Sequence, residues 1–117
     1  MTVATVSVER RDTGPIVHVR GDIDLSNADT VRNEILATIP LDGPGMIIDL
    51  TETTYLSSSG VRLLFDVAER LQGRHQRLVL VATNEGMIGR VVALTKLDDL
   101  VPLVTTVDEA LDALENG

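Results

Sequence analysis

The feature that most constrains this chain is a hydrophobic period that switches repeatedly between the spacing of a strand and the spacing of a helix. Residues 46–50 and 78–82 form two nearly unbroken apolar runs, each of the length of a strand. Apolar residues then recur at intervals of three and four over 61–71 and over 87–94. Unbroken apolar runs are typical of central strands covered on both faces, and amphipathic helices provide that cover. The pattern therefore predicts an α/β fold with a mostly parallel sheet.

The N-terminal segments add an antiparallel strand to this sheet. Residues 5–10 and 16–21 alternate between apolar and polar side chains, and turn-forming residues separate them, which predicts a hairpin. The period then changes to that of a helix over about 27–38. Ser26 and Asp29 have the spacing of a capping box at the start of this helix, with Asp in place of Glu.

The C-terminal part repeats the alternation on a smaller scale. Residues 101–104 are typical of a short edge strand, where a proline is tolerated. Thr106 and Glu109 have capping-box spacing for a last helix. The expected order is β-β-α-β-α-β-α-β-α, with four helices and right-handed crossovers. Because 117 residues is near the modal size of a domain, we expect 1–117 to form a single domain.

Composition excludes several classes of function. Aromatic residues make up 2% of the chain, which leaves almost no surface for stacking on single-stranded nucleic acid. The formal net charge of -8 repels phosphate backbones and anionic membranes on average, so we expect no nucleic-acid binding and no direct membrane binding. Without cysteine the chain has no disulfides or thiolate nucleophiles. No apolar run is long enough to span a bilayer and signal-peptide features are absent, which predicts a cytoplasmic protein.

Three serines and a glycine, Ser57–Gly60, precede the second amphipathic helix. One hydroxyl is expected to cap the helix and the glycine to allow close approach of another backbone, which leaves two hydroxyls over. Because a helix N-terminus offers free amides and positive partial charge, a phosphate is tolerated there. A small hydrolase with a nucleophilic serine is the competing hypothesis, but the G-x-S-x-G motif is absent and His18 and His75 lie elsewhere in the sequence. We therefore expect a protein that is not an enzyme.

Asp22 and Asp24 are the other candidates for chemistry. Because they are two residues apart, an extended backbone places both carboxylates on one face. A magnesium site would combine such carboxylates with a substrate phosphate, but the chain has no glycine-rich phosphate-binding loop of the Walker or dinucleotide type. We interpret the pair as solvated residues at a strand end, and we expect no metal and no cofactor.

Three segments together resemble the STAS domain family, and within it the single-domain bacterial anti-sigma factor antagonists. Gly21–Asp24 is similar to the glycine-acidic-aliphatic-Asp signature ahead of the family's first helix. Ile47–Leu50, followed by Tyr55–Val61, is similar to the family's strand, loop and Asp-Ser-Ser/Thr-Gly-Leu motif at the start of the second helix. Leu94–Leu97 stands where the family tends to have a Gly-Leu pair. The resemblance covers nearly the whole chain and implies a STAS-like mixed sheet.

The resemblance also implies a phosphorylation switch. In that family the serine after the motif Asp is phosphorylated by a cognate anti-sigma factor with serine kinase activity; this position corresponds to Ser58, with Ser59 as the alternative. The unphosphorylated protein binds the anti-sigma factor and frees the sigma factor, and a serine phosphatase resets the switch. Asp24 is implied to lie near the phosphoacceptor on the partner-facing surface.

The expected interface combines this motif with one side of the second helix. Leu63 and Val67 lie off the apolar stripe of that helix, so we expect them to be exposed contact residues. The expected partner-binding residues are Asp22, Asp24, Ser57, Ser58, Ser59, Gly60, Arg62, Leu63, Asp66 and Val67.

Three positions depart from the family pattern. Ser57 replaces the motif Asp, Val61 replaces the motif Leu, and Lys96 replaces a helix-ending glycine. Since Ser57 removes a carboxylate beside the acceptor, a second function stays open. It is a STAS accessory subunit of an ABC-type membrane transport complex, which needs no phosphorylation.

Overall fold

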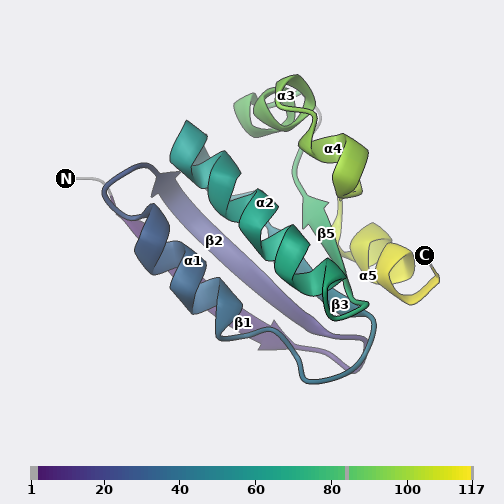
Figure 1. Ribbon diagram of the computed structural model, residues 1–117. Helices are drawn as coiled ribbons and strands as arrows, with labels where there is room; N and C mark the ends of the chain where they lie inside the picture. The colour runs from purple at the N-terminus through teal and green to yellow at the C-terminus, as the bar shows by residue number, and fades with distance from the viewer. Residues whose placement is uncertain (1–2, 84, 117) are drawn as a thin grey trace.

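The computed structural model describes residues 3–83 and 85–116 as one six-stranded sheet with helices on both of its faces (Figure 1). In chain order the elements are β1 (Ala4–Arg10), β2 (Pro15–Ile23), α1 (Ala28–Leu36), β3 (Gly45–Asp49), β4 (Thr53–Leu56), α2 (Ser58–Gln72), β5 (Arg77–Val81), α3 (Met87–Leu94), α4 (Leu97–Leu100), β6 (Leu103–Val104) and α5 (Val107–Asn116). The mixed, mostly parallel α/β fold expected from the sequence is confirmed.

The long strand β2 organises the sheet, because it pairs with two parallel strands in succession. The main path runs β1-β2-β3-β5-β6, with β1 antiparallel to β2 as the hairpin prediction requires. The first half of β2 pairs with β3, and its last residues pair with β4. The register shifts between Gly21 and Asp22, and Gly21 has a φ of 94°, a conformation that favours glycine. This irregularity lets one strand serve two partners.

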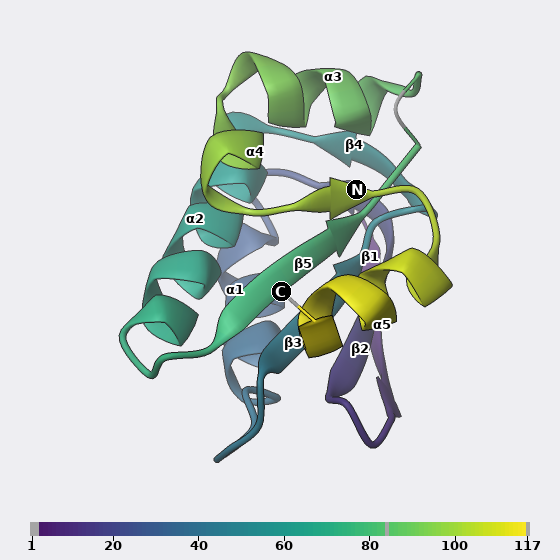
Figure 2. The same ribbon diagram turned by 90° about the vertical axis from the view of Figure 1, so that its right-hand side faces the viewer.

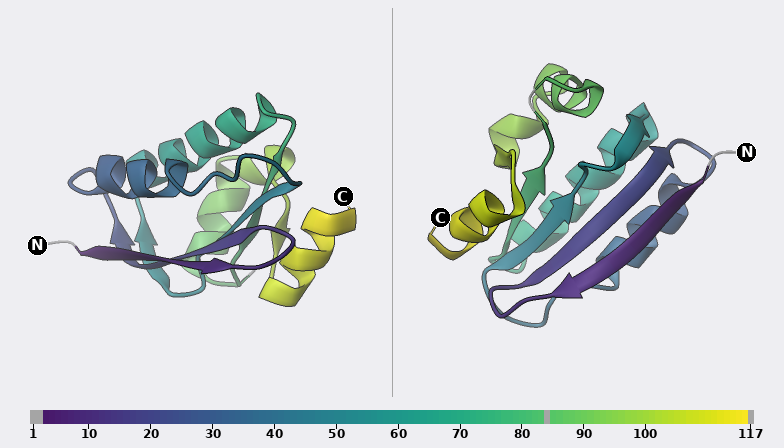
Figure 3. Two further views of the ribbon diagram at one scale, coloured as in Figure 1. Left: turned by 90° about the horizontal axis from the view of Figure 1, so that it is seen from below. Right: turned by 180° about the vertical axis from the view of Figure 1, so that it is seen from behind.

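Two hydrophobic clusters hold the layers together. Helices α1 and α2 cover one face of the sheet and α5 lies against the other (Figure 3, left). Because side chains alternate along a strand, Val17 of β2 faces the larger cluster, whereas its neighbour Ile16 joins Ala110 and Leu114 of α5 in the smaller one. Helices α3 and α4 complete the end of the molecule near β4 (Figure 2). No helix among the described residues is long and apolar enough to cross a membrane.

The structure adds two elements to the sequence expectation, so the predicted count of four helices was wrong. Strand β4 lies in a polar stretch where only Thr53 and Leu56 are buried, and its pairing with β2 rather than its composition makes it a strand. Helix α4 has four residues, too few to show a helical period. The expected strand over 101–104 is limited to Leu103–Val104.

Of the two predicted capping boxes, the one at α1 is absent and the one at α5 is present. At α1 the capping-box prediction was wrong: the N-cap is Asn27, whose side chain makes no cap hydrogen bond. Its amide oxygen instead accepts from the Asp24 N–H, and Ser26 Oγ donates to the Asp24 carboxylate. At α5 the Glu109 N–H donates to Thr106 Oγ1 at 3.1 Å, so that predicted cap is confirmed.

Candidate functional site

A groove lies between the N-terminal halves of α1 and α2, with a volume of about 690 Å³. Both helices begin at the same end of the sheet (Figure 1). Asp29 and Arg32 line the groove from α1, and Ser58 and Arg62 line it from α2. Crevices at the carboxyl ends of parallel strands are the usual binding places of open α/β sheets. We refer to this feature as the α1–α2 groove.

The three serines at the N-terminus of α2 have different surroundings: one caps the helix, and the other two line the groove. Ser57 is the N-cap, and its Oγ accepts a hydrogen bond from the Gly60 N–H at 3.3 Å. The Ser57 N–H donates to the Ile23 carbonyl at 2.9 Å, which fixes the helix start against β2. Ser58 is exposed and Ser59 half-buried, and both line the α1–α2 groove. Capping therefore leaves two hydroxyls over, and that of Ser58 is the more exposed of the two, at the positive end of a 15-residue helix.

Gly60 is required by packing. A Cβ at this position would lie 2.5 Å from Leu56 Cδ1 and 3.1 Å from Ile23 Cγ2. The close neighbours are thus side chains of β4 and β2, not the backbone expected from the sequence. A larger residue would push the start of α2, and with it Ser58, away from the sheet.

Asp22 and Asp24 have different partners. The Asp22 carboxylate accepts a hydrogen bond from Thr54 Oγ1 of β4, and Asp24 accepts from the N–H and Oγ of Ser26. Asp24 therefore shapes the turn that leads into α1 at the edge of the groove. No group of three or more His, Cys, Asp or Glu residues within 3–83 and 85–116 is arranged to hold a metal ion.

A line of alternating charges crosses the groove from α1 to α2. Arg32 Nη2 lies 3.7 Å from Asp29 Oδ1, and Arg32 Nη1 lies 3.8 Å from Asp66 Oδ2. On α2, Arg62 Nε lies 3.7 Å from the other oxygen of Asp66. The side chain of Arg62 is 81% exposed and that of Asp66 is 35% exposed. Both residues are therefore accessible, as expected from the sequence.

The expected exposure of Leu63 and Val67 was wrong. Leu63 is 2% exposed and Val67 is fully buried. Helix α2 contacts α1 on one side, α4 on the other and the strands beneath, so its buried arc is wider than the single stripe used to predict it. These two residues belong to the core and are unavailable to a partner.

Two other apolar side chains are exposed at or next to the groove. Leu25, in the loop before α1, is 84% exposed and lines the groove. Leu94 is 83% exposed and precedes Thr95, which also lines it. The exposure of Leu25 could have been predicted from the sequence, because it is an isolated apolar residue in a polar turn. That of Leu94 could not, because Leu94 fits the apolar period of α3.

Lys96 has a φ of 63°, in the left-handed region, where the family pattern has glycine.

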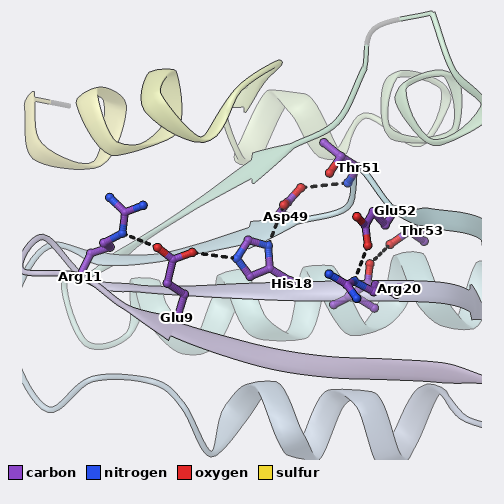
Figure 4. A network of polar contacts seen from close by, with 9 residues as sticks. Glu9, Arg11, His18, Arg20, Asp49, Thr51, Glu52 and Thr53 are labelled. Carbon is purple, nitrogen blue, oxygen red and sulfur yellow. Dashed lines mark hydrogen bonds and ion pairs between the residues drawn. The ribbon is translucent and has the colours of Figure 1, made fainter.

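A second polar cluster lies on the same face of the sheet as α5 (Figure 4). His18 Nδ1 is 2.8 Å from Asp49 Oδ2, and His18 Nε2 is 3.2 Å from Glu9 Oε1. Burial acts to lower the pKa of His18, but the hydrogen bonds to Asp49 and Glu9 outweigh it and the pKa is raised. Hydrogen bonds from Arg11 and His18 lower the pKa of Glu9. The partly wet face expected at His18 is present, but its partners come from two other strands.

Comparisons with known proteins agree with this architecture. The family model described as STAS domain matches residues 5–110. The anti-sigma-B factor antagonist of Listeria monocytogenes is 28% identical over 100 residues, covering 85% of this chain and 87% of that protein. The anti-sigma-F factor antagonist RsfB of Mycobacterium tuberculosis is 27% identical, covering 97% and 91%.

A solved structure gives a closer match. The crystal structure of an anti-sigma factor antagonist from Mycobacterium paratuberculosis superposes with a TM-score of 0.88 at 32% identity, covering 97% of this chain and 96% of that one. The family model covers most of the chain, and the superposition extends over nearly all of it. The chain therefore belongs to the STAS domain family.

Proposed function

We propose that this protein is an anti-sigma factor antagonist that is switched off by phosphorylation of Ser58. In this proposal it binds an anti-sigma factor with serine kinase activity and so releases a sigma factor. The observation that carries the proposal is the exposed Ser58 hydroxyl, which lines the α1–α2 groove while Ser57 caps the helix. Since Ser is as good an N-cap as Asp, Ser57 can cap α2 at the position where the family motif has Asp.

Phosphorylation at this place changes binding more than folding. The kinase transfers the γ-phosphoryl group of ATP to Ser58 Oγ, the hydroxyl proton is lost and ADP leaves. The product carries about -1.5 to -2 charges at neutral pH. The helix N-terminus compensates by about 0.3–1 kcal/mol, so the fold tolerates the group. A partner that closes over the groove must desolvate this charge, and a buried unpaired charge costs several kcal/mol. Binding is lost while the structure is kept, and a serine phosphatase restores it.

The proposed contact surface surrounds Ser58. It comprises the exposed leucines Leu25 and Leu94, the accessible charges Arg62 and Asp66, and the turn at Asp24. Leu63 and Val67 are no longer part of it, because both are buried. The partner is expected to offer apolar side chains to the two leucines and complementary charges to the groove.

The acceptor is tested by labelling. The wild type, Ser58→Ala and Ser59→Ala are each incubated with ATP and with purified GHKL-type serine kinases of the source organism, and the products are read by mass spectrometry. We expect one kinase to phosphorylate the wild type and Ser59→Ala but not Ser58→Ala. Equal labelling of all three proteins would contradict the assignment to Ser58, and loss of labelling only in Ser59→Ala would transfer it to Ser59.

Partner choice is tested by co-purification from the native cell. The wild type is expected to retain a kinase of this type, and a Ser58→Glu variant is expected to release it. Ser58→Gln has the same side-chain length without the charge and is expected to retain the kinase, so it separates charge from size. Recovery of an ATPase subunit and a permease instead would support the transport-subunit hypothesis and reject the one proposed.

A further inference from the structure

Arg62 is the more exposed of the two arginines in the charge line across the α1–α2 groove. Its guanidinium is held by Asp66 at 3.7 Å, and 81% of its side chain is exposed to solvent. Exposed surface pairs of this kind contribute little to stability and break readily. Arg62 is therefore free to take a stronger partner without cost to the fold.

Helix geometry puts Ser58 within reach of Arg62. The two residues are four apart on α2, hence on the same face, and both line the groove. Side chains on a helix lean toward its N-terminus, so an Arg62 side chain released from Asp66 can extend over the turn that contains Ser58. In a helix an anion four residues before a cation is favoured over the reverse order. The Arg62–Asp66 pair has the unfavoured order, and a phosphate on Ser58 would give Arg62 the favoured one.

Asp66 keeps a partner when Arg62 leaves. Its second carboxylate oxygen lies 3.8 Å from Arg32 Nη1 of α1. Arg32 in turn pairs with Asp29, which is 89% exposed and well solvated. The exchange therefore leaves no unpaired carboxylate in the groove. Asp22 and Asp24, two further carboxylates near the end of β2, accept hydrogen bonds from Thr54 and Ser26 respectively.

We propose that phosphorylation of Ser58 makes Arg62 exchange Asp66 for the phosphoryl oxygens, so that α2 clamps its own phosphate at the mouth of the groove. This inference rests on the proposed function, because it takes Ser58 as the acceptor. The planar guanidinium suits a phosphate, with which it can form two parallel hydrogen bonds. The clamp withdraws Arg62 from the partner-binding surface at the same moment as it fixes the negative charge there.

The test uses protein phosphorylated at Ser58 by genetically encoded phosphoserine, so that no kinase is needed. The second pKa of the phosphate is measured by 31P NMR titration in the wild type, Arg62→Gln, Arg62→Lys and Arg70→Gln. A cation that pairs with the phosphate favours its dianion, so we expect Arg62→Gln to raise this pKa by about 0.15–0.4 unit. Arg62→Lys should restore part of the shift, and Arg70→Gln, with the same change in net charge at the far end of α2, should leave the wild-type value.

A second readout follows the guanidinium itself. The Arg62 Nε–H resonance is expected to shift between the unphosphorylated and phosphorylated proteins and to titrate with the phosphate. Equal pKa values in Arg62→Gln and Arg70→Gln, or an unmoved Nε–H resonance, would overturn the clamp. Such a result leaves the labelling of Ser58 by a kinase untouched. Conversely, absence of labelling would reject the proposed function although the encoded phosphoserine still showed the clamp.

Discussion

Ser57 and Ser58 are chemically identical neighbours whose surroundings give them different tasks. The Oγ of Ser57 accepts from the Gly60 N–H, whereas Ser58 is exposed at the groove. The fold depends on the first hydroxyl and the proposed switch on the second. This division is testable at the level of single residues.

We expect Ser57→Ala to lower the free energy of unfolding by about 1 kcal/mol, because it removes an N-cap. Ser58→Ala should change it by less than about 0.5 kcal/mol, as exposed substitutions generally do. Ser57→Asp restores a capping side chain and should recover most of the lost stability. Urea unfolding followed by circular dichroism measures all three, and equal stability of Ser57→Ala and the wild type would reject the capping role.

At the scale of elements, the Glu9–His18–Asp49 cluster joins three adjacent strands through one imidazole (Figure 4). Glu9 lies on β1, His18 on β2 and Asp49 at the end of β3. Asp49 also accepts from the Thr51 N–H at 2.9 Å, so it helps to shape the turn between β3 and β4. The other charged residues at this place are Arg11, which pairs with Glu9, and the ion pair of Arg20 with Glu52.

This cluster predicts a pH dependence of stability. The pKa of His18 is raised above its ordinary value of 6.5, so its contribution is complete below about pH 6.5 and is lost as pH rises through the folded-state pKa. The pKa of Glu9 is lowered from 4.5, so its part is present above about pH 4.5 and is lost as pH falls through the folded-state pKa. We expect the wild type to lose stability relative to His18→Gln as the pH rises above about 6.5, measured by urea unfolding.

The control for this experiment is His75→Gln, which removes the other histidine. His75 is exposed and outside the cluster. Its variant should keep the pH dependence of the wild type, even if its absolute stability differs. Parallel stability curves for the wild type and His18→Gln would contradict the proposed contribution of the cluster.

At the scale of the whole molecule, the α1–α2 groove lies outside the core that supports it. Leu63 and Leu25 both line the groove, yet Leu63 is 2% exposed and Leu25 is 84% exposed. We expect Leu63→Ala to lower the free energy of unfolding by about 2–5 kcal/mol, because it leaves a cavity in the core. Leu25→Ala should change it by less than about 0.5 kcal/mol while weakening capture of the proposed partner. Equal stability losses of the two variants in chemical unfolding would contradict the assignment of Leu63 to the core and of Leu25 to the surface.

Much of this architecture was predictable, and the misses have physical causes. The alternating periods predicted the sheet and its helices because covered strands and amphipathic helices leave different apolar spacings. Strand β4 and helix α4 were missed because neither carries such a period: β4 is fixed by pairing with β2, and α4 is a single turn. Leu63 and Val67 were misassigned because a helical period shows one stripe, whereas α2 has neighbours on several sides.

The fold class and the place of the serine cluster at the start of a helix could be predicted from local spacing alone. Tertiary packing was needed to show which serine caps α2, which leucines are exposed, and that Arg32 of α1 shares Asp66 with Arg62. It also decided that His18 meets Asp49, thirty-one residues further along the chain. Such contacts depend on how the elements pack across the sheet, and this packing cannot be predicted from the local spacing of residues.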